Sequence, residues 1–539
     1  MKLSDLSKKS KALLALTCLL YAAYAATGTV EYYWLSEGVN AAIAGDSGQF
    51  IRYSGYVVGM LLASFVLIFI AIVMRNLYMA NGVLTVKDAM IRNILKRPVA
   101  GFRKKDNAYW MNLFTTDTDM YRLDYLNKFP LIAFSAVMFL SALVVLVTLS
   151  PLLVGTTLLF ALLPFAISQF FTGIIQNRRS AYSAASEAQV GILKENLEGY
   201  ETIRADGTWR AFHGRFHLAS SEKYRSLTRL NFANAIGGKS SWDILWIIQC
   251  VEIALGIWLV LQGRLSAGML LAVSSYVSSI SNGAGNLIEY AMGIRSTKEL
   301  RDKLKTESSA LCEEATMDFH DAPAAIDYEN VSFSFGERQL YDNMSFHFRP
   351  GGCYVIVGES GSGKSTLTKL LLKYYDDYTG TIRLAGKDIR SLTEPDIYQM
   401  VSVVNQSPYL FNVSLYENIT MFGAKPGKDS EEYRALLERL NLTELAKRVG
   451  DEPLGDFGDR ISGGERQRIN IARSLRHHPA IMIFDEPTTG LDPENAHLIN
   501  EFIFSQTDMT RIVISHDWSE DYLGRFDQVV AIGQGRGYT

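Results

Sequence analysis

A glycine-rich segment, GESGSGKST at positions 358–366, has the residue types and spacing of a phosphate-binding loop. It follows the apolar run CYVIV and precedes the helical pattern TLTKLLLKYY, which is the strand–loop–helix context that this motif requires. Its glycines let backbone N–H groups approach an anion at a helix N-terminus. Lys364 can reach the β- and γ-phosphates of a nucleotide, and Ser365, directly after it, can coordinate Mg2+. The predicted nucleotide-binding residues of the loop are Gly358, Ser360, Gly361, Gly363, Lys364, Ser365 and Thr366. The segment therefore predicts ATP and Mg2+ as cofactors.

Two further apolar runs end in side chains that suit the same chemistry. AIMIFDEP ends in Asp485 and Glu486, and RIVISHD ends with His516 followed by an aspartate. Hydrolysis of a nucleotide needs one carboxylate to organise Mg2+ and another to polarise the attacking water. We expect Asp485 to bind the metal and Glu486 to be the general base. His516 taken alone fits a structural histidine equally well, and its place after the other motifs favours a catalytic role.

The composition disfavours several classes of protein. A net charge of -3 over 539 residues gives no sign of a nucleic-acid-binding surface. The four cysteines are far apart in the sequence and form no CxxC pair, so we expect neither a disulfide framework nor a zinc site. The adjacent pair His477 and His478 favours a surface position over a metal site. A hydrophobic fraction of 48% lies between soluble and wholly membrane-embedded proteins, which indicates one part of each kind.

The N-terminal part contains six apolar stretches of the length, about 20 residues, that a helix needs to span a bilayer. We expect these spans at residues 12–34, 53–75, 129–150, 151–177, 242–262 and 265–290. The long loops after the second and fourth spans are rich in Lys and Arg, which places them, the N-terminus and the C-terminal part in the cytoplasm. As an alternative, Ala23-Tyr24-Ala25 imitates the cleavage site of a secretory signal, and its removal would leave five helices.

The two long loops have helical patterning, so the membrane helices are expected to extend into the cytoplasm. Val190, Leu193, Leu197 and Tyr200 recur at three- and four-residue spacing between charged positions. The predicted organisation is an α-helical transmembrane domain of six helices with long cytoplasmic extensions at 1–300, a linker at 301–324, and an α/β P-loop nucleotide-binding domain at 325–539.

The order of the motifs resembles that of the ATP-binding cassette family. After the P-loop come NQSPYLF with Gln406, ISGGERQR with its signature Ser462, Gly463 and Gly464, then IMIFDEPTTGLD and His516. SGGERQR just upstream of FDEP is highly specific. The match covers essentially the whole chain, since six helices followed by one cassette are similar to a half-transporter of the bacterial exporter type.

The resemblance implies further site residues and a partner. In that family ATP lies between the P-loop of one cassette and the signature of another, so one copy of each implies a dimer; a homodimer is simpler than a heterodimer with a degenerate partner. Gln406 would join the catalytic and metal-binding residues, His516 would contact the γ-phosphate, and Asp492 would belong to a loop that crosses between subunits. Phe335 stands where the family often has a tyrosine stacked on adenine.

The resemblance also implies the activity. We expect ATP-driven export of a solute by alternating access across the bacterial cytoplasmic (inner) membrane, with coupling helices near Pro98–Asn112 and Ala205–His213 docking on the cassettes. The transported molecule can be a small molecule, a peptide or a lipid. Two alternatives share every motif: an importer of a metal chelate on the same fold, and a regulatory membrane protein that transports nothing.

Glu252 in the fifth span is the one residue that predicts a substrate pathway. A carboxylate near the bilayer midplane is costly and should face the bundle interior or a cavity. It shares a helical face with Trp246 and Gln249, which combines aromatic and polar side chains. We therefore predict that these three residues form a wall of the pathway and that substrates carry positive charge. The alternative is a glutamate that is hydrogen-bonded to a neighbouring helix for packing alone.

Overall fold

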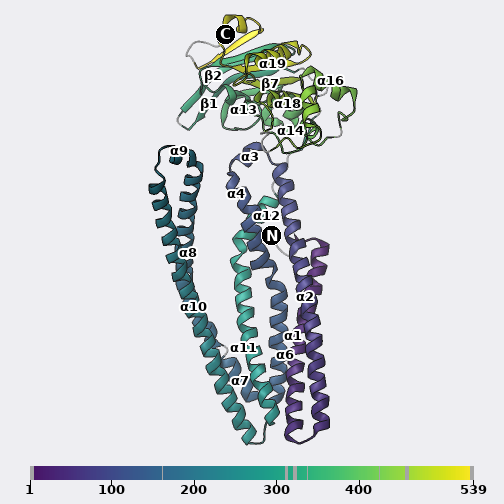
Figure 1. Ribbon diagram of the computed structural model, residues 1–539, viewed down its shortest axis with the longest axis vertical. Helices are drawn as coiled ribbons and strands as arrows, with labels where there is room; N and C mark the ends of the chain where they lie inside the picture. Colours follow the sequence, from purple (N-terminus) through teal and green to yellow (C-terminus); the bar gives the residue numbers. More distant parts are fainter. Residues whose placement is uncertain are drawn as a thin grey trace. The chain divides into compact units, whose positions relative to one another are not determined.

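The computed structural model of the chain describes residues 5–160, 162–309, 314–317, 319, 324–336, 338–423, 425–455 and 460–533. The chain divides into two compact units, Met1–Ile91 with Ala108–Ser309, and Arg92–Asn107 with Ala310–Thr539. The described residues of the first unit form helices joined by short turns, and all described strands belong to the second (Figure 1). The predicted order of a helical domain followed by an α/β domain is confirmed.

The first unit is built from long helices that pack along their lengths. Contacts join α1 to α6 and α11, α6 to α11, and α8 to α10, and Figure 1 shows α8 and α10 running together as a pair. Two short π-helical turns at Leu113–Asp117 and Tyr121–Leu126 flank α5. The helices are α1 Lys8–Ile43, α2 Ser47–Leu95, α4 Asn107–Asn112, α5 Thr118–Met120, α6 Lys128–Leu149, α7 Pro151–Phe160, α8 Leu162–Glu198, α9 Tyr200–Ala205, α10 Trp209–Leu261, α11 Ala267–Ser296 and α12 Lys298–Ser308.

The predicted spans 12–34 and 53–75 lie within α1 and α2. The spans 129–150, 242–262 and 265–290 extend one or two residues beyond α6, α10 and α11, and the span 151–177 covers α7 and the first part of α8. The predicted boundary between the third and fourth spans coincides with the break between α6 and α7. Within the described residues, three helical segments are long and apolar enough to cross a membrane, at Lys8–Ile43, Ser47–Leu95 and Tyr109–Leu149. Pro151–Phe160 and Trp246–Leu261 are shorter apolar helices. The count of six spans therefore stays a prediction.

Small residues allow the helices of this unit to approach closely. A Cβ added at Gly268 of α11 would lie 2.1 Å from the carbonyl oxygen of Ser36 in α1, and one at Gly283 would lie 2.9 Å from the Cβ of Phe139 in α6. Such contacts between small residues are how helices associate where no hydrophobic effect drives them together. The helical extensions predicted for the loops are present, since α2 continues to Leu95 and α8 to Glu198.

The second unit contains two sheets whose facing sides form its core. The antiparallel sheet has the order β2-β1-β4-β5 and the parallel sheet the order β6-β7-β8-β3-β9. All six residues of β3 are buried, as expected for a strand covered on both faces. Tyr354 and Ile356 face the antiparallel sheet, whereas Val355 and Val357 face the helices on the other side. The strands are β1 Ile326–Phe335, β2 Arg338–Phe348, β3 Cys353–Gly358, β4 Tyr378–Leu384, β5 Lys387–Asp388, β6 Val401–Val404, β7 Ile481–Asp485, β8 Thr510–Ser515 and β9 Gln528–Ile532.

The unit also takes a short helix from the N-terminal part of the chain. α3, Val99–Arg103, clusters with the sheets rather than with the long helices. The other helices are α13 Lys364–Leu371, α14 Glu394–Met400, α15 Leu415–Thr420, α16 Glu431–Arg439, α17 Thr443–Val449, α18 Gly463–Leu475, α19 Pro493–Ser505 and α20 Glu520–Leu523, with a 3-10 turn at Ile389–Ser391. The segment predicted as a linker begins within α12, and part of it lies outside the described residues.

Candidate functional site

The glycine-rich loop connects β3 to α13, and its backbone explains its composition. Gly361 and Gly363 have φ angles of 77° and 105°, a left-handed region that favours glycine. Gly358 is required for a different reason, because a Cβ there would lie 2.5 Å from the carbonyl oxygen of Ile532. Gly363 is the N-cap of α13 and offers no side-chain cap. The first-turn N–H groups of α13 therefore remain available to an anion.

Lys364 is the first residue of α13, and its side chain folds back over the loop. It is only 5% exposed, and its ammonium donates to the carbonyl oxygens of Gly358 at 2.8 Å and Glu359 at 3.0 Å. Nζ also lies 3.2 Å from Nδ1 of His516. Burial lowers the pKa of Lys364, while the two carboxylates at the end of β7 oppose that shift. A bound phosphate would favour the charged ammonium further.

Ser365 and Asp485 form a pair of oxygen ligands at the carboxyl end of β7. Ser365 Oγ donates to Asp485 Oδ1 at 3.0 Å. Burial raises the pKa of Asp485, and the hydrogen bond from Ser365 partly offsets it. Mg2+ prefers oxygen ligands and usually takes only one or two from the protein, with the rest from water and phosphate. These residues therefore fit the predicted ion, and no cluster of three or more His, Cys, Asp or Glu in the described part of the chain offers another metal site.

Glu486 follows β7 directly and holds three side chains. Its Oε1 lies 2.6 Å from Nε2 of His516, and its Oε2 accepts from Nε2 of Gln406 at 2.6 Å and from Oγ1 of Thr489 at 3.3 Å. Because the ammonium of Lys364 can only donate, His516 Nδ1 accepts from it, and Nε2 carries the proton that is donated to Glu486. Glu486 also has a left-handed φ of 48°, the kind of local strain that clusters at functional sites.

These elements border a cavity of about 410 Å³, which is within the usual size range of ligand pockets. The predicted residues that line it are Phe335, Ser360, Gly361, Gly363, Lys364, Ser365, Thr366, Glu486 and His516. Three other predicted residues contact the lining residues by hydrogen bonds: Gly358, Asp485 and Gln406. The Phe335 ring is 44% exposed and lies 5.1 Å from the ring of Tyr375, so it can offer a face to a base.

Sequence reasoning missed two residues of β2 that support the loop. Arg338 lines the cavity and donates from Nη2 to the carbonyl oxygen of Gly361 at 3.0 Å. The Tyr341 hydroxyl donates to the carbonyl oxygen of Gly363. No spacing in the sequence marks either residue, because they reach the loop only through the packing of one sheet on the other.

The signature residues do not line this cavity. Ser462 and Gly463 are exposed at the start of α18, where Ser462 and Glu465 form a reciprocal capping box. Gly464 is buried, and a Cβ there would lie 2.8 Å from Cγ of Asn495. Asp492 is the N-cap of α19 and accepts from the backbone N–H of Asn495 at 3.0 Å. The predicted site residues therefore form two separate groups within one chain.

The first of the two predicted docking segments contacts the nucleotide-binding domain. The backbone N–H of Val99 in α3 donates to both carboxylate oxygens of Glu394, at 2.8 and 3.0 Å, and Glu394 is only 6% exposed. The guanidinium of Arg103 lies 5.0 Å from the centre of the Tyr374 ring. The second segment, 205–213, joins α9 to α10 in the other unit.

A small polar cavity lies between α10 and α11. It measures about 120 Å³ and is lined by Trp246 and Gln249 of α10 and by Ser278, Ser281 and Asn282 of α11, with two aliphatic neighbours. The Gln249 amide donates to the Ser278 hydroxyl. Ser281 is 8% exposed, and its hydroxyl has no hydrogen-bond partner among the described residues. Two of the three residues predicted for a pathway wall thus lie together here.

Glu252 is not among the residues that line this cavity. Its side chain is 1% exposed, and its Oε2 accepts from Thr156 Oγ1 of α7 at 3.2 Å. Its Oε1 has no partner among the described residues. This placement matches the packing alternative. The side chains that line the cavity are uncharged, so the cavity gives no support to a cation preference, which stays a prediction.

Two family models match the chain. The model described as ABC transporter matches residues 341–489, and the model described as ABC transporter transmembrane region matches residues 14–283. Among solved structures, a bacterial Atm1-family ABC exporter with ATP bound is similar, with a TM-score of 0.78 and 21% sequence identity; the match covers 98% of this chain and 94% of that one.

The matches to curated relatives cover smaller shares of both chains than the match to that exporter structure does. The mitochondrial ATP-dependent permease MDL2 of Saccharomyces cerevisiae is 30% identical over 404 residues, which cover 72% of this chain and 51% of the permease. The ATP-dependent lipid A-core flippase of Francisella tularensis is 26% identical over 385 residues, 68% of this chain and 62% of the flippase. The mycobactin import ATP-binding/permease protein IrtB of Mycolicibacterium smegmatis is 32% identical over 287 residues, 52% of this chain and 49% of that protein. The chain thus spans about half to two thirds of the length of these relatives.

Proposed function

Because the chain belongs to the ATP-binding cassette transporter family, we propose that it hydrolyses ATP to export a solute across the bacterial cytoplasmic membrane by alternating access. The observation that carries the proposal is the cavity in which one lysine, one serine–aspartate pair and one glutamate–histidine pair converge at the end of the glycine-rich loop. This is the set of groups that phosphoryl transfer to water requires.

We assign the roles of the residues from their contacts. Lys364 would hold the β- and γ-phosphates, and Ser365 and Asp485 would hold Mg2+, which would neutralise charge on the phosphates. Glu486 accepts the proton of the attacking water. His516 fixes the carboxylate of Glu486 by its 2.6 Å contact and faces the γ-phosphate, and Gln406 positions the other carboxylate oxygen.

We propose a homodimer as the working unit. Ser462 and Gly463 are exposed and outside the cavity, which fits a signature that completes the site of a second copy. The cytoplasmic parts of α8 and α10 also expose large apolar side chains, with Leu197 67%, Leu218 72% and Phe232 66% exposed. Exposed apolar surface of this kind marks an interaction surface, and a second copy would cover it.

The coupling path begins at α3, whose backbone N–H is held by the buried carboxylate of Glu394. We propose that movements of the nucleotide-binding domain reach the membrane helices through this contact in one chain and through residues 205–213 on the partner. The pathway would run past Trp246 and Gln249, at the polar cavity between α10 and α11.

Transport in sealed liposomes tests the proposal and its direction. The purified protein is reconstituted with the cassettes facing outward, and ATP-dependent accumulation is measured for a panel of labelled lipids, peptides and small molecules, with Glu486→Gln as the inactive control. Accumulation inside the liposomes supports export. ATP-dependent release from preloaded liposomes would instead indicate import, which the IrtB relative makes the second candidate. Absence of both transport and substrate-stimulated hydrolysis would contradict the proposal.

A further inference from the structure

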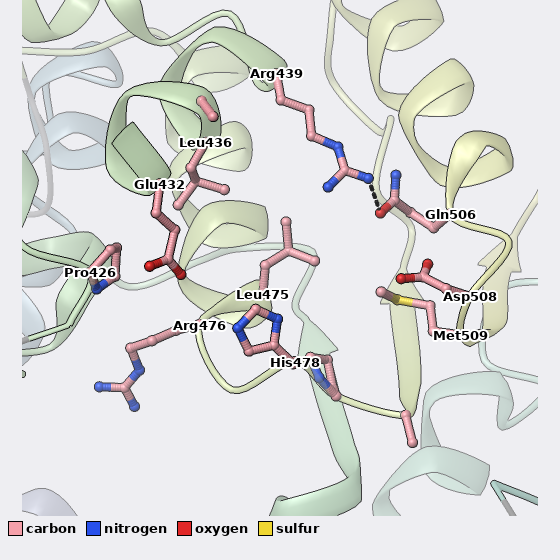
Figure 2. Close-up of a pocket in the computed structure, with 13 residues that line it drawn as sticks. Pro426, Glu432, Leu436, Arg439, Leu475, Arg476, His478, Gln506, Asp508 and Met509 are labelled. Carbon is pink, nitrogen blue, oxygen red and sulfur yellow. Dashed lines mark hydrogen bonds between the residues drawn. The ribbon is translucent and has the colours of Figure 1, made fainter. Parts of the chain in front are cut away.

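A second cavity in the nucleotide-binding domain lies at the amino ends of strands β7 and β8, whereas the nucleotide site lies at their carboxyl ends. It measures about 490 Å³ and is bordered by α16, by the C-terminal end of α18 and by the segments that precede β7 and β8 (Figure 2). The two strands begin here at Ile481 and Thr510, whereas Glu486 and His516 follow their other ends. Five residues of strand extend roughly 17 Å. The two cavities share no lining residue, so a ligand in this one does not reach the nucleotide.

The floor of the cavity is apolar. Leu436 of α16, Leu475 at the end of α18 and Met509 before β8 line it from three elements, and Met509 is 8% exposed. In Figure 2 Leu475 lies between the charged side chains on the left and those on the right. A ligand with an apolar portion would therefore displace water from this floor on binding.

Two guanidinium groups at the cavity are held by uncharged partners. Arg439 donates to the amide oxygen of Gln506, the dashed contact in Figure 2, and lies 5.4 Å from the centre of the Phe502 ring. Arg476 donates to the carbonyl oxygen of Thr420 at 2.7 Å. Neither guanidinium forms a salt bridge within the described ranges of the chain. Their orientation is thus fixed while their positive charges remain unneutralised, which is a preorganised site for a carboxylate.

Two carboxylates face the same space. Glu432 of α16 and Asp508 before β8 are exposed and line the cavity, and neither forms a salt bridge within the part of the chain that the structure describes. Figure 2 places Glu432 with Arg476 on the left and Asp508 with Gln506 on the right. Opposite charges in one small cavity would normally pair, but each guanidinium donates to an uncharged oxygen instead of to Glu432 or Asp508. The carboxylates would repel a polyphosphate and attract an ammonium group.

We propose that this cavity binds a small zwitterionic molecule with an apolar side chain, of the size of a short peptide, and that its binding changes the rate of ATP hydrolysis. The carboxylate of the ligand would meet Arg439, its ammonium would meet Glu432 on the other side of Leu475, and its side chain would lie on the apolar floor. The regulatory part rests on the proposed ATPase activity, whereas the binding part does not.

The connection to catalysis follows from two rigid elements. α18 begins at Gly463, next to the signature Ser462, and ends at Leu475 in the wall of the cavity. β7 begins beside the cavity and ends at Asp485, the proposed metal ligand. A ligand that fixes the cavity end of α18 would therefore bias the position of the signature on the partner's nucleotide.

Calorimetry with leucyl-leucine as the probe tests the binding. The full-length protein in detergent should bind the dipeptide, and N-acetyl-leucyl-leucine and leucyl-leucinamide should bind at least about tenfold more weakly, since each lacks one charge. Glu432→Gln should weaken binding by about tenfold as well. Glu438→Gln is the matched control, since Glu438 is exposed on the same helix but does not line the cavity. Ala435→Trp, which fills the cavity from α16, should abolish binding.

Several results would overturn the proposal. Absence of dipeptide binding, equal binding of the acetylated analogue, or binding that survives both Glu432→Gln and Ala435→Trp would each remove the assigned ligand class. Binding that leaves the ATPase rate unchanged at saturation would remove the regulatory part. A protein without ATPase activity that still binds the dipeptide would contradict the proposed function and leave the binding site intact.

Discussion

Glu486→Gln tests the assignment of the general base while disturbing the site little. Glutamine has the same length, and its amide oxygen can still accept from one of the two donors that contact the wild-type carboxylate, Nε2 of Gln406 or Nε2 of His516. It has no group that accepts a proton from water at neutral pH. Loss of a general base slows a reaction by about 100- to 10,000-fold, which is about 3–5 kcal/mol of activation free energy. We expect kcat for ATP to fall by this amount, with ATP affinity little changed because the glycine-rich loop and Lys364 are untouched.

Phosphate release at saturating Mg-ATP and binding of a fluorescent ATP analogue give the two readouts on the same preparation. Lys364→Ala should behave in the opposite way and lose nucleotide binding, because its ammonium is the buried cation of the loop. Glu444→Gln, at an exposed carboxylate on α17, should leave both readouts unchanged. Hydrolysis by Glu486→Gln at close to the wild-type rate would refute the assignment.

Three further changes are predicted from the structure. Burial tends to raise the pKa of Glu465, but hydrogen bonds from the signature serine and from Arg448 outweigh burial and lower the pKa. The ionised carboxylate therefore stabilises the fold fully above the unfolded pKa of about 4.3, and this stabilisation is lost as the pH falls through the lower folded pKa. Glu465→Gln should flatten the dependence of Tm on pH in that acid range, and an unchanged slope would contradict the reasoning. Glu394→Ala leaves the Val99 N–H without its buried acceptor, at a cost of about 1–3 kcal/mol, and should reduce transport per ATP hydrolysed more than basal hydrolysis; equal losses would argue against a coupling role. Glu252→Gln should lower thermal stability without changing the relative stimulation of ATPase activity by cationic and neutral compounds. A loss of stimulation by cationic compounds alone would indicate that Glu252 contacts the substrate.

Local patterns were enough to predict most of the candidate site. Each residue of the glycine-rich loop is adjacent to the next in sequence, and strand–loop–helix geometry fixes where its N–H groups point. Asp485 ends β7 and His516 directly follows β8, and these parallel strands are neighbours in the sheet, so the convergence of the two residues follows once the strands are recognised. The helical domain was likewise predictable, because apolar length alone indicates a membrane span. Contacts that join distant segments do not follow from local patterns: the grouping of α3 with the nucleotide-binding domain was expected only from the family resemblance, since the sequence places α3 between two spans.

By itself, the sequence determined the chemistry available to this protein, since the types and spacing of the loop, the carboxylates and the signature are properties of short segments. Only the tertiary structure decided which of those groups meet. It links Lys364, His516 and Glu486 in one chain of contacts and brings Arg338 against the loop. It also turns Glu252 toward Thr156 rather than into the polar cavity. The physical reason is that helical periodicity fixes the face on which a side chain lies, while the neighbour of that face depends on how distant helices and strands pack.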